Sequence, residues 1–100
     1  DYLGSENMMR MLLKLNGIGH TIIIITHDMR IVGKYARRAI VLDKGKVLLD
    51  GSTRQIFSEF DTLRRCFLLP PQITRIGREL GFKGEETVLT VEEMLSRLGD

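Results

Sequence analysis

Four consecutive isoleucines, Ile22–Ile25, constrain the fold of this chain more than any other feature. Apolar, β-branched side chains on both faces of a segment are typical of a strand buried between two layers of helices, as in a parallel sheet. Such a strand needs a neighbour on each side, and the chain has few other strand candidates. We therefore expect residues 20–26 to form a strand of an α/β fold whose sheet is completed elsewhere. The chain begins with Asp1 rather than Met, which fits a segment of a larger protein, although a processed small domain stays open as the alternative.

Composition limits the size and the partners of the fold. The chain has 100 residues, 43% hydrophobic and 28% charged, which allows at most one domain with one modest core. A net charge of +2, the lack of Trp and the lack of a basic run interleaved with aromatic residues argue against nucleic acid as a partner. The single cysteine, Cys66, excludes an internal disulfide and fits a reducing compartment. No apolar run reaches the roughly 20 residues of a membrane span.

Helical patterns and one hairpin account for the rest of the chain. Asp43-Lys44-Gly45 joins the β-prone runs 39–42 and 46–49, and Gly45 supplies the positive φ that a tight hairpin turn requires. We expect a helix over 5–16 with Ser5 as its N-cap and a short helix over 29–36. A third helix is expected to start at Ser52 or Thr53, and its apolar pattern continues to Phe67. Two further helices are expected, over 71–80 and from Val91 to a stop at Gly99. Thr90 and Glu93 form a capping-box pattern, in which the Thr90 hydroxyl takes the Glu93 amide and the glutamate reaches back.

The isoleucine run is followed directly by Thr26-His27-Asp28. Ligands of open α/β sheets bind beyond the carboxyl ends of the strands, so an imidazole delivered there could contact a terminal phosphate or an attacking water. The alternative for His27 is a structural bond to a loop carbonyl. Asp28 either orients His27 or caps the helix that starts at Met29, and capping is the simpler role.

Other chemically active residues predict less. His20 lies at the opposite end of the expected strand, so the two histidines cannot share a metal, and we expect no metal site built by this chain alone. Cys66 lies in an apolar register and is expected to fill the core. No Gly-rich loop of the Walker type occurs in the chain.

The order of these parts resembles the C-terminal portion of an ABC transporter ATPase subunit. Thr-His-Asp after a buried strand, a short helix, the hairpin Ala-Ile-Val-Leu-Asp-Lys-Gly-Lys-Val and Asp-Gly-Ser before a helix match that family from Asp1 to Phe57. The resemblance implies an α/β fold, the C-terminal part of a P-loop NTPase sheet with a β-hairpin and a helical C-terminal extension. It places His27 at the family's switch histidine, which contacts the γ-phosphate and holds the attacking water. It places Asp1 at the D-loop aspartate, a second nucleotide-binding candidate.

The sequence after Leu68 narrows the resemblance. Leu-Pro-Pro-Gln-Ile-Thr-Arg-Ile-Gly, followed by Val-Leu-Thr-Val-Glu-Glu, is similar to the extension of energy-coupling-factor and cobalt/nickel import ATPases, which helps to pair two ATPase subunits. We therefore divide the chain into an ATPase-core part, 1–58, and an extension, 59–100. The expected dimer interface consists of the apolar stripes of the extension: Ile73, Ile76, Leu80, Val91, Met94 and Leu98. The alternative is that these stripes pack back on their own domain.

The family resemblance implies a parent protein that binds ATP and Mg²⁺ and hydrolyses ATP to drive import of a vitamin or a metal ion such as cobalt or nickel. Its partners would be a second ATPase subunit and transmembrane transporter subunits, at the cytoplasmic face of the cell membrane. The Walker A loop, Q-loop, signature motif and Walker B acids do not occur in these 100 residues, so we expect the segment alone neither to hydrolyse ATP nor to bind it tightly. Two alternatives stay open: a stand-alone interaction module, and a receiver-like regulatory domain, which would need an acid cluster that the sequence lacks.

Overall fold

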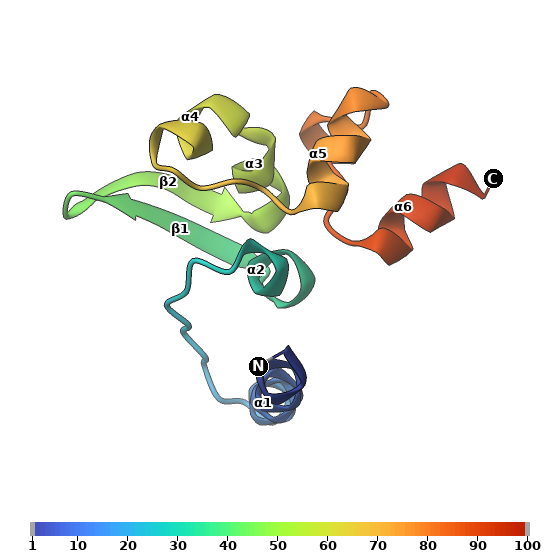
Figure 1. Ribbon diagram of the computed structural model, residues 1–100. Coiled ribbons are helices and arrows are strands. Elements are labelled where there is room, and N and C mark those ends of the chain that lie inside the picture. Colours follow the sequence, from blue (N-terminus) through green and yellow to red (C-terminus); the bar gives the residue numbers. More distant parts are fainter. Residues whose placement is uncertain (1, 100) are drawn as a thin grey trace.

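A computed structural model of the chain describes residues 2–99. The elements are α1 (Tyr2–Gly17), α2 (Met29–Tyr35), β1 (Arg38–Asp43), β2 (Lys46–Ser52), α3 (Thr53–Ser58), α4 (Phe60–Arg65), α5 (Gln72–Glu79), the 3₁₀ turn η1 (Gly84–Glu86) and α6 (Val91–Leu98). They form a small α/β unit in which α3 and α4 lie against the hairpin and α5 and α6 follow beyond α3, while α1 lies on the α2 side at the start of a long connection (Figure 1).

The predicted hairpin is confirmed, with longer strands than the sequence indicated. Strands β1 and β2 pair antiparallel, with an irregularity between Val41 and Leu42. The two turn residues, Lys44 and Gly45, have φ values of 52° and 77°. Positive φ at both central residues is the geometry that matches the right-handed twist of a two-residue hairpin. Gly45 was expected to adopt this conformation, and Lys44 shares it.

Most predicted helices are also confirmed, and local hydrogen bonds explain their starts. Ser52 caps α3 through a reciprocal pair with Gln55: the Ser52 hydroxyl accepts from the Gln55 amide at 3.1 Å, and the Gln55 side chain accepts from the Ser52 amide at 3.0 Å. Two details differ from the expectation. Helix α1 begins at Tyr2, so Ser5 lies within it and does not cap it. The apolar pattern over 53–67 is divided into α3 and α4 by Glu59, whose ψ of 63° interrupts the helical backbone.

Three helix ends share one hydrogen-bonding pattern. After α4, the Phe67 amide donates to the Arg64 carbonyl at 3.0 Å and the Leu68 amide donates to the Leu63 carbonyl at 2.9 Å, which is a Schellman motif. The same pair of bonds ends α1 at Gly19 and α5 at Gly81. The residue at the turning point has a positive φ in each case, 108° at Gly19, 97° at Gly81 and 59° at Phe67.

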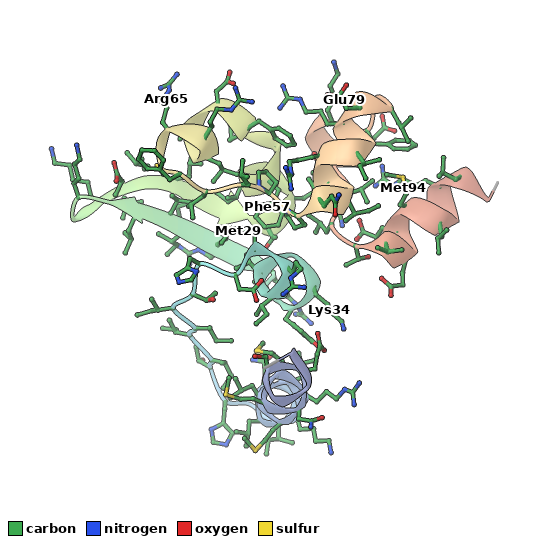
Figure 2. The ribbon with its side chains drawn as sticks, in the orientation of Figure 1. Met29, Lys34, Phe57, Arg65, Glu79 and Met94 are labelled. Atoms are coloured by element: carbon green, nitrogen blue, oxygen red, sulfur yellow. The ribbon has the colours of Figure 1, made fainter. Side chains whose placement is uncertain are left out.

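The core lies between the hairpin, α3 and α4. Val41, Ile56, Phe57 and Leu63 form a buried cluster, and Phe57 lies at its centre beside α2 and α5 (Figure 2). Partly buried residues surround this cluster: Met29, Val32, Ala39, Leu49, Cys66, Leu68 and Leu89. The core-filling role predicted for Cys66 is thus confirmed.

A second, smaller packed region lies within the tail, which we define as residues 59–100. Val88 is fully buried and Met94 is 4% exposed. A Cβ atom at Gly77 would lie only 3.1 Å from the Met94 methyl and 3.2 Å from a Val88 methyl, so α5 and α6 approach closely around Val88. Part of the tail therefore packs on itself and, through Leu63, on the core.

The predicted strand over 20–26 is wrong for this structure. These residues lie outside any helix or strand, and Ile23 and Ile25 are 87% and 98% exposed. A strand needs a partner for its backbone N–H and C=O groups, and the one sheet found in residues 2–99 consists of β1 and β2 paired with each other. The isoleucine pattern indicates that these side chains prefer to be buried. It carries no information about whether a strand is present to pair with them.

No helix within residues 2–99 combines the length and the apolar character that crossing a bilayer would require.

Candidate functional site

His27 lies exposed at the end of the isoleucine segment, directly before α2. The following residue fixes the backbone here. The Asp28 carboxylate accepts from the Arg30 amide at 3.0 Å and so caps α2, which confirms the simpler of the two roles considered for Asp28. The Asp28 amide in turn donates to the Thr26 hydroxyl at 3.0 Å. These two bonds hold the turn that presents His27.

The imidazole borders an open cavity of about 500 Å³, which we name the His27 cavity. One wall consists of residues 27–30, and the other consists of residues 67–72 with Arg75. The cavity therefore brings His27 together with two guanidinium groups, Arg30 and Arg75, and with apolar side chains of the tail. Imidazole and guanidinium groups are suitable donors to phosphate oxygens. Sequence reasoning missed the tail wall, because no local pattern relates Arg75 to a residue 48 positions before it.

Helix α2 approaches the tail and Phe57 closely at Gly33, so that a side chain there would be crowded. A Cβ atom there would lie 3.1 Å from the Leu89 carbonyl oxygen, 3.1 Å from Phe57 Cε2 and 3.4 Å from Pro71 Cγ. Glycine in the middle of a helix lowers helix stability, so a buried one is often kept for a close approach of this kind. Pro71 also lines the His27 cavity, so one tail residue contacts both the cavity and α2.

An ion pair between α3 and α6 holds this part of the tail. The Arg54 guanidinium donates to both carboxylate oxygens of Glu93, at 2.9 and 3.0 Å, and to the Thr87 carbonyl at 2.6 Å. Glu93 Oε1 also accepts from the Leu89 amide at 3.0 Å. The bonds from Arg54 lower the pKa of Glu93, partial burial opposes this, and the Leu89 amide adds to the lowering. We refer to this contact as the Arg54–Glu93 pair.

The predicted capping box at Thr90 forms only in part. The Thr90 hydroxyl accepts from the Glu93 amide at 3.2 Å, as expected. The Glu93 carboxylate bonds to the Leu89 amide and Arg54, whereas the expected bond runs to the backbone of Thr90. The side chain is diverted because a guanidinium from another element offers it two charge-assisted hydrogen bonds.

A second polar contact ties α1 to α2. The Glu6 carboxylate accepts from Lys34 Nζ at 3.0 Å and from the Tyr35 hydroxyl. The bond from Tyr35, followed by the bond from Lys34, lowers the pKa of Glu6, and the bond to Glu6 raises the pKa of Lys34 and that of Tyr35. Lys34 extends from α2 in Figure 2. Asp1, the predicted D-loop residue, lies outside the described residues.

Most of the residues predicted for an interface lie at the tail surface. Ile76, Leu80, Val91 and Leu98 are 47%, 57%, 53% and 59% exposed, and Ile73 is half-buried. Leu95, which is not among the predicted interface residues, is 64% exposed on α6. Met94 differs, because it is buried against Gly77 and Val88 and so lies inside the tail. A role in subunit pairing stays a prediction for the exposed members.

Comparison with known proteins gives relatives over nearly the whole chain. No protein-family model matches it. The energy-coupling factor transporter ATP-binding protein EcfA2 of Clostridium tetani is 42% identical over 78% of this chain and 28% of its own length. The EcfA2 protein of Lactobacillus johnsonii is 32% identical over 97% of the chain and 35% of its own length. The EcfA1 protein of Caldanaerobacter subterraneus subsp. tengcongensis is 38% identical over 95% of the chain and 35% of its own length.

The chain thus spans about a third or less of these curated relatives. All three are described as energy-coupling factor transporter ATP-binding proteins, at 32% to 42% identity. This is the family that the motifs around His27, in the hairpin and in the tail resemble. The chain therefore belongs to the ABC transporter ATP-binding proteins and corresponds to part of their length.

Proposed function

We propose that this chain is the switch-histidine segment and C-terminal extension of an ATP-binding subunit, with a P-loop NTPase fold, that energises import of a vitamin or a metal ion such as cobalt or nickel. Residues 1–58 would complete the ATPase core and residues 59–100 would form the extension. The observation that carries the proposal is His27, which is exposed at the His27 cavity beside Arg30 and Arg75 in a chain whose relatives are energy-coupling factor ATP-binding proteins.

His27 would contact the γ-phosphate of ATP and hold the attacking water, with Asp1 near the nucleotide. The imidazole and the two guanidinium groups of the lining suit a phosphate group, and the Asp28 carboxylate in the same lining lies 3.6 Å from Arg30 Nε. Among residues 2–99, however, no group of three His, Cys, Asp or Glu side chains is arranged to hold a metal ion. The Mg²⁺ ligands and the phosphate cradle would therefore come from the remainder of the parent protein. Phosphoryl transfer depends on positioning of the reacting groups and on neutralisation of the developing charge. Positioning of the attacking water is the role that we propose for His27.

The first test is His27→Ala in the intact ATP-binding protein that contains this segment. We expect ATP turnover to fall about 100-fold or more, while the Kd for ATP changes little, because a group that positions the nucleophile acts mainly in the transition state. The measurement is steady-state phosphate release together with equilibrium ATP binding. His20→Ala is the matched control, since it removes an exposed imidazole seven residues earlier. Normal turnover in the His27 variant would remove His27 from the mechanism.

We also propose that the exposed apolar residues of α5 and α6 pair two ATPase subunits. Ile76, Leu80, Val91, Leu95 and Leu98 are each about half exposed or more on two adjacent helices, which is unfavourable unless another surface covers them. The buried Met94 would act indirectly, by fixing α6 on α5.

The test of pairing is sedimentation equilibrium of Ile76→Asp and Leu98→Asp. Both should weaken self-association of the chain strongly, because each places a charge in the apolar contact. Leu42→Asp is the matched control, since Leu42 is 65% exposed on the hairpin. Dimers that survive both tail variants, or that are lost only with Leu42→Asp, would contradict the assignment.

Partners of the parent protein would be a second ATPase subunit and transmembrane transporter subunits, which would place it at the cytoplasmic face of the membrane. The exposed apolar surface of the tail also supports a second candidate, a stand-alone interaction module without nucleotide chemistry. The mass of the native product separates the two. A product more than twice 11.4 kDa supports the ATPase, and one near 11.4 kDa supports the module.

A further inference from the structure

We propose that the tail positions the His27 imidazole through α2 and that the Arg54–Glu93 pair holds the tail in the position that does so. The inference rests on the proposed function and adds a regulatory connection to it. Glu93 lies on α6, 66 residues after His27, and it would act as a positioning residue that never touches the nucleotide.

The first step connects His27 to α2. His27 immediately precedes Asp28, and Asp28 caps α2 through the Arg30 amide. The cap bond ties the residue after His27 to the first turn of this seven-residue helix. Any displacement of α2 therefore displaces the backbone of His27 and changes where the imidazole points in the cavity.

The second step connects α2 to the tail. At Gly33 the approach is close: a Cβ atom there would lie 3.1 Å from the Leu89 carbonyl oxygen and 3.4 Å from the Pro71 ring, so a methyl group would push its neighbours aside. Pro71 is buried and lines the His27 cavity as well. Closely packed contacts of this kind transmit displacement, because neither side can yield without losing contact. The tail is thus in contact with α2 and with the opposite wall of the cavity.

The third step identifies what fixes the tail. The Leu89 amide is bonded to Glu93, and Glu93 is bonded twice to Arg54 on α3. Helix α3 is itself anchored to the end of α2, because Thr53 donates its hydroxyl to the Ala36 carbonyl at 2.7 Å and its amide to the Arg37 carbonyl at 3.1 Å. Loss of the Arg54–Glu93 pair would release Leu89 while this anchor stays intact.

The experiment compares Glu93→Ala, Glu93→Gln and Gly33→Ala. In the 100-residue chain, the ring signals of its two histidines, His20 and His27, are followed by ¹H–¹³C NMR. We expect Glu93→Ala and Gly33→Ala to shift the His27 signal and leave the His20 signal in place. Glu93→Gln should shift it less, because the amide oxygen can still accept from Leu89 and Arg54. The controls are Glu92→Gln on the exposed side of α6 and Gly17→Ala, where a methyl group meets nothing.

In the intact ATP-binding protein, Glu93→Ala should lower kcat about 10- to 100-fold with KM for ATP unchanged, since displacement of a positioning group by about 1 Å can cost that much. Glu93→Gln should restore much of the rate, which a purely structural loss would not explain.

The outcomes separate this proposal from the one on which it rests. If His27→Ala abolishes turnover but Gly33→Ala and Glu93→Ala leave both kcat and the His27 signal unchanged, the positioning role is wrong and the proposed function stands. If His27→Ala has no effect on turnover, the proposed function itself fails. If Glu93→Ala does not fold, Gly33→Ala decides, because it opens the same contact without removing the ion pair and adds helix propensity to α2.

Discussion

Phe67 is one of two non-glycine residues within 2–99 that have a positive φ, and Lys44 in the hairpin turn is the other. The other two Schellman turns of this chain place glycine at the position where φ is positive, at Gly19 and Gly81, whereas α4 ends with Phe67 at a φ of 59°. The left-handed conformation costs a residue with a Cβ atom about 1–2 kcal/mol. Phe67 also gains little burial in return, since its side chain is 96% exposed at the rim of the His27 cavity. The chain therefore holds an unfavourable residue at the first turn of the tail wall.

Phe67→Gly should stabilise the chain by up to about 1 kcal/mol. The relief of the left-handed strain outweighs the larger conformational entropy of glycine in the unfolded state. Urea denaturation of the chain measures the change. Gly81→Ala is the converse control and should destabilise by a similar amount, because it places a Cβ atom at a φ of 97°. A destabilised Phe67→Gly would instead mean that the phenyl ring contributes contacts that its exposure does not reveal.

At the scale of elements, short-range hydrogen bonds and turn residues determine several of the helix and hairpin boundaries. Residues far apart in the sequence determine the contacts between the elements. Asp28, Ser52 and Gly45 each act as the sequence predicts, because a cap or a tight turn is completed within a few residues. The contact of Gly33 with Leu89 joins positions 56 apart in the chain. No periodicity encodes such a pairing, so the tail wall of the His27 cavity and the Arg54–Glu93 pair could not be predicted from the sequence.

The Arg54–Glu93 pair makes docking of α6 dependent on pH. Its carboxylate has a folded-state pKa below the ordinary value of 4.5. The stability that it contributes is therefore complete above about pH 4.5 and is lost as the pH falls through the lowered value. The pKa of Glu6 is also lowered, by Tyr35 and Lys34, and the pKa of Asp50 is lowered by Arg38. The pH dependence of global unfolding would therefore combine the contributions of all three carboxylates.

The measurement should therefore be local, following the Leu89 amide by NMR between pH 7 and pH 3. In the wild type, its signal should move as Glu93 is protonated, because this amide donates to the titrating carboxylate. In Glu93→Gln the movement should disappear, while signals near Glu6 still titrate. An unchanged Leu89 titration in that variant would mean that another group controls the docking of α6.

At the scale of the whole molecule, one region has a packed core, and one segment, residues 20–26, pairs with no strand among residues 2–99. The hairpin, α3 and the tail surround Phe57, whereas Ile23 and Ile25 are almost fully exposed. The sequence predicted the core position of Cys66 and the burial preference of the isoleucines, yet the strand is absent because pairing requires a neighbouring backbone. Since the chain spans about a third or less of its relatives, we infer that the remaining part of the parent protein supplies that neighbour.

Ile25→Lys tests this inference, because its effect on stability should differ between the 100-residue chain and the intact protein. In the 100-residue chain it should change the free energy of unfolding by no more than about 0.5 kcal/mol, because the side chain is already 98% exposed. Ile56→Ala, at a position 3% exposed, is the control and should cost about 2–5 kcal/mol. In the intact protein, Ile25→Lys should be as damaging as the core variant, since it would bury an unpaired charge. Equal tolerance in both contexts would show that the segment stays outside the sheet.

The position of Cys66 has a practical consequence. It is the single cysteine of the chain, it is half-buried, and it packs against the core cluster at the C-terminal end of α4, within the tail. A thiol that is partly shielded in this way reacts with an alkylating reagent faster when its surroundings open. The native sequence therefore contains its own reporter for tail release, and the alkylation rate of Cys66 can be compared with and without a partner subunit without introducing any label.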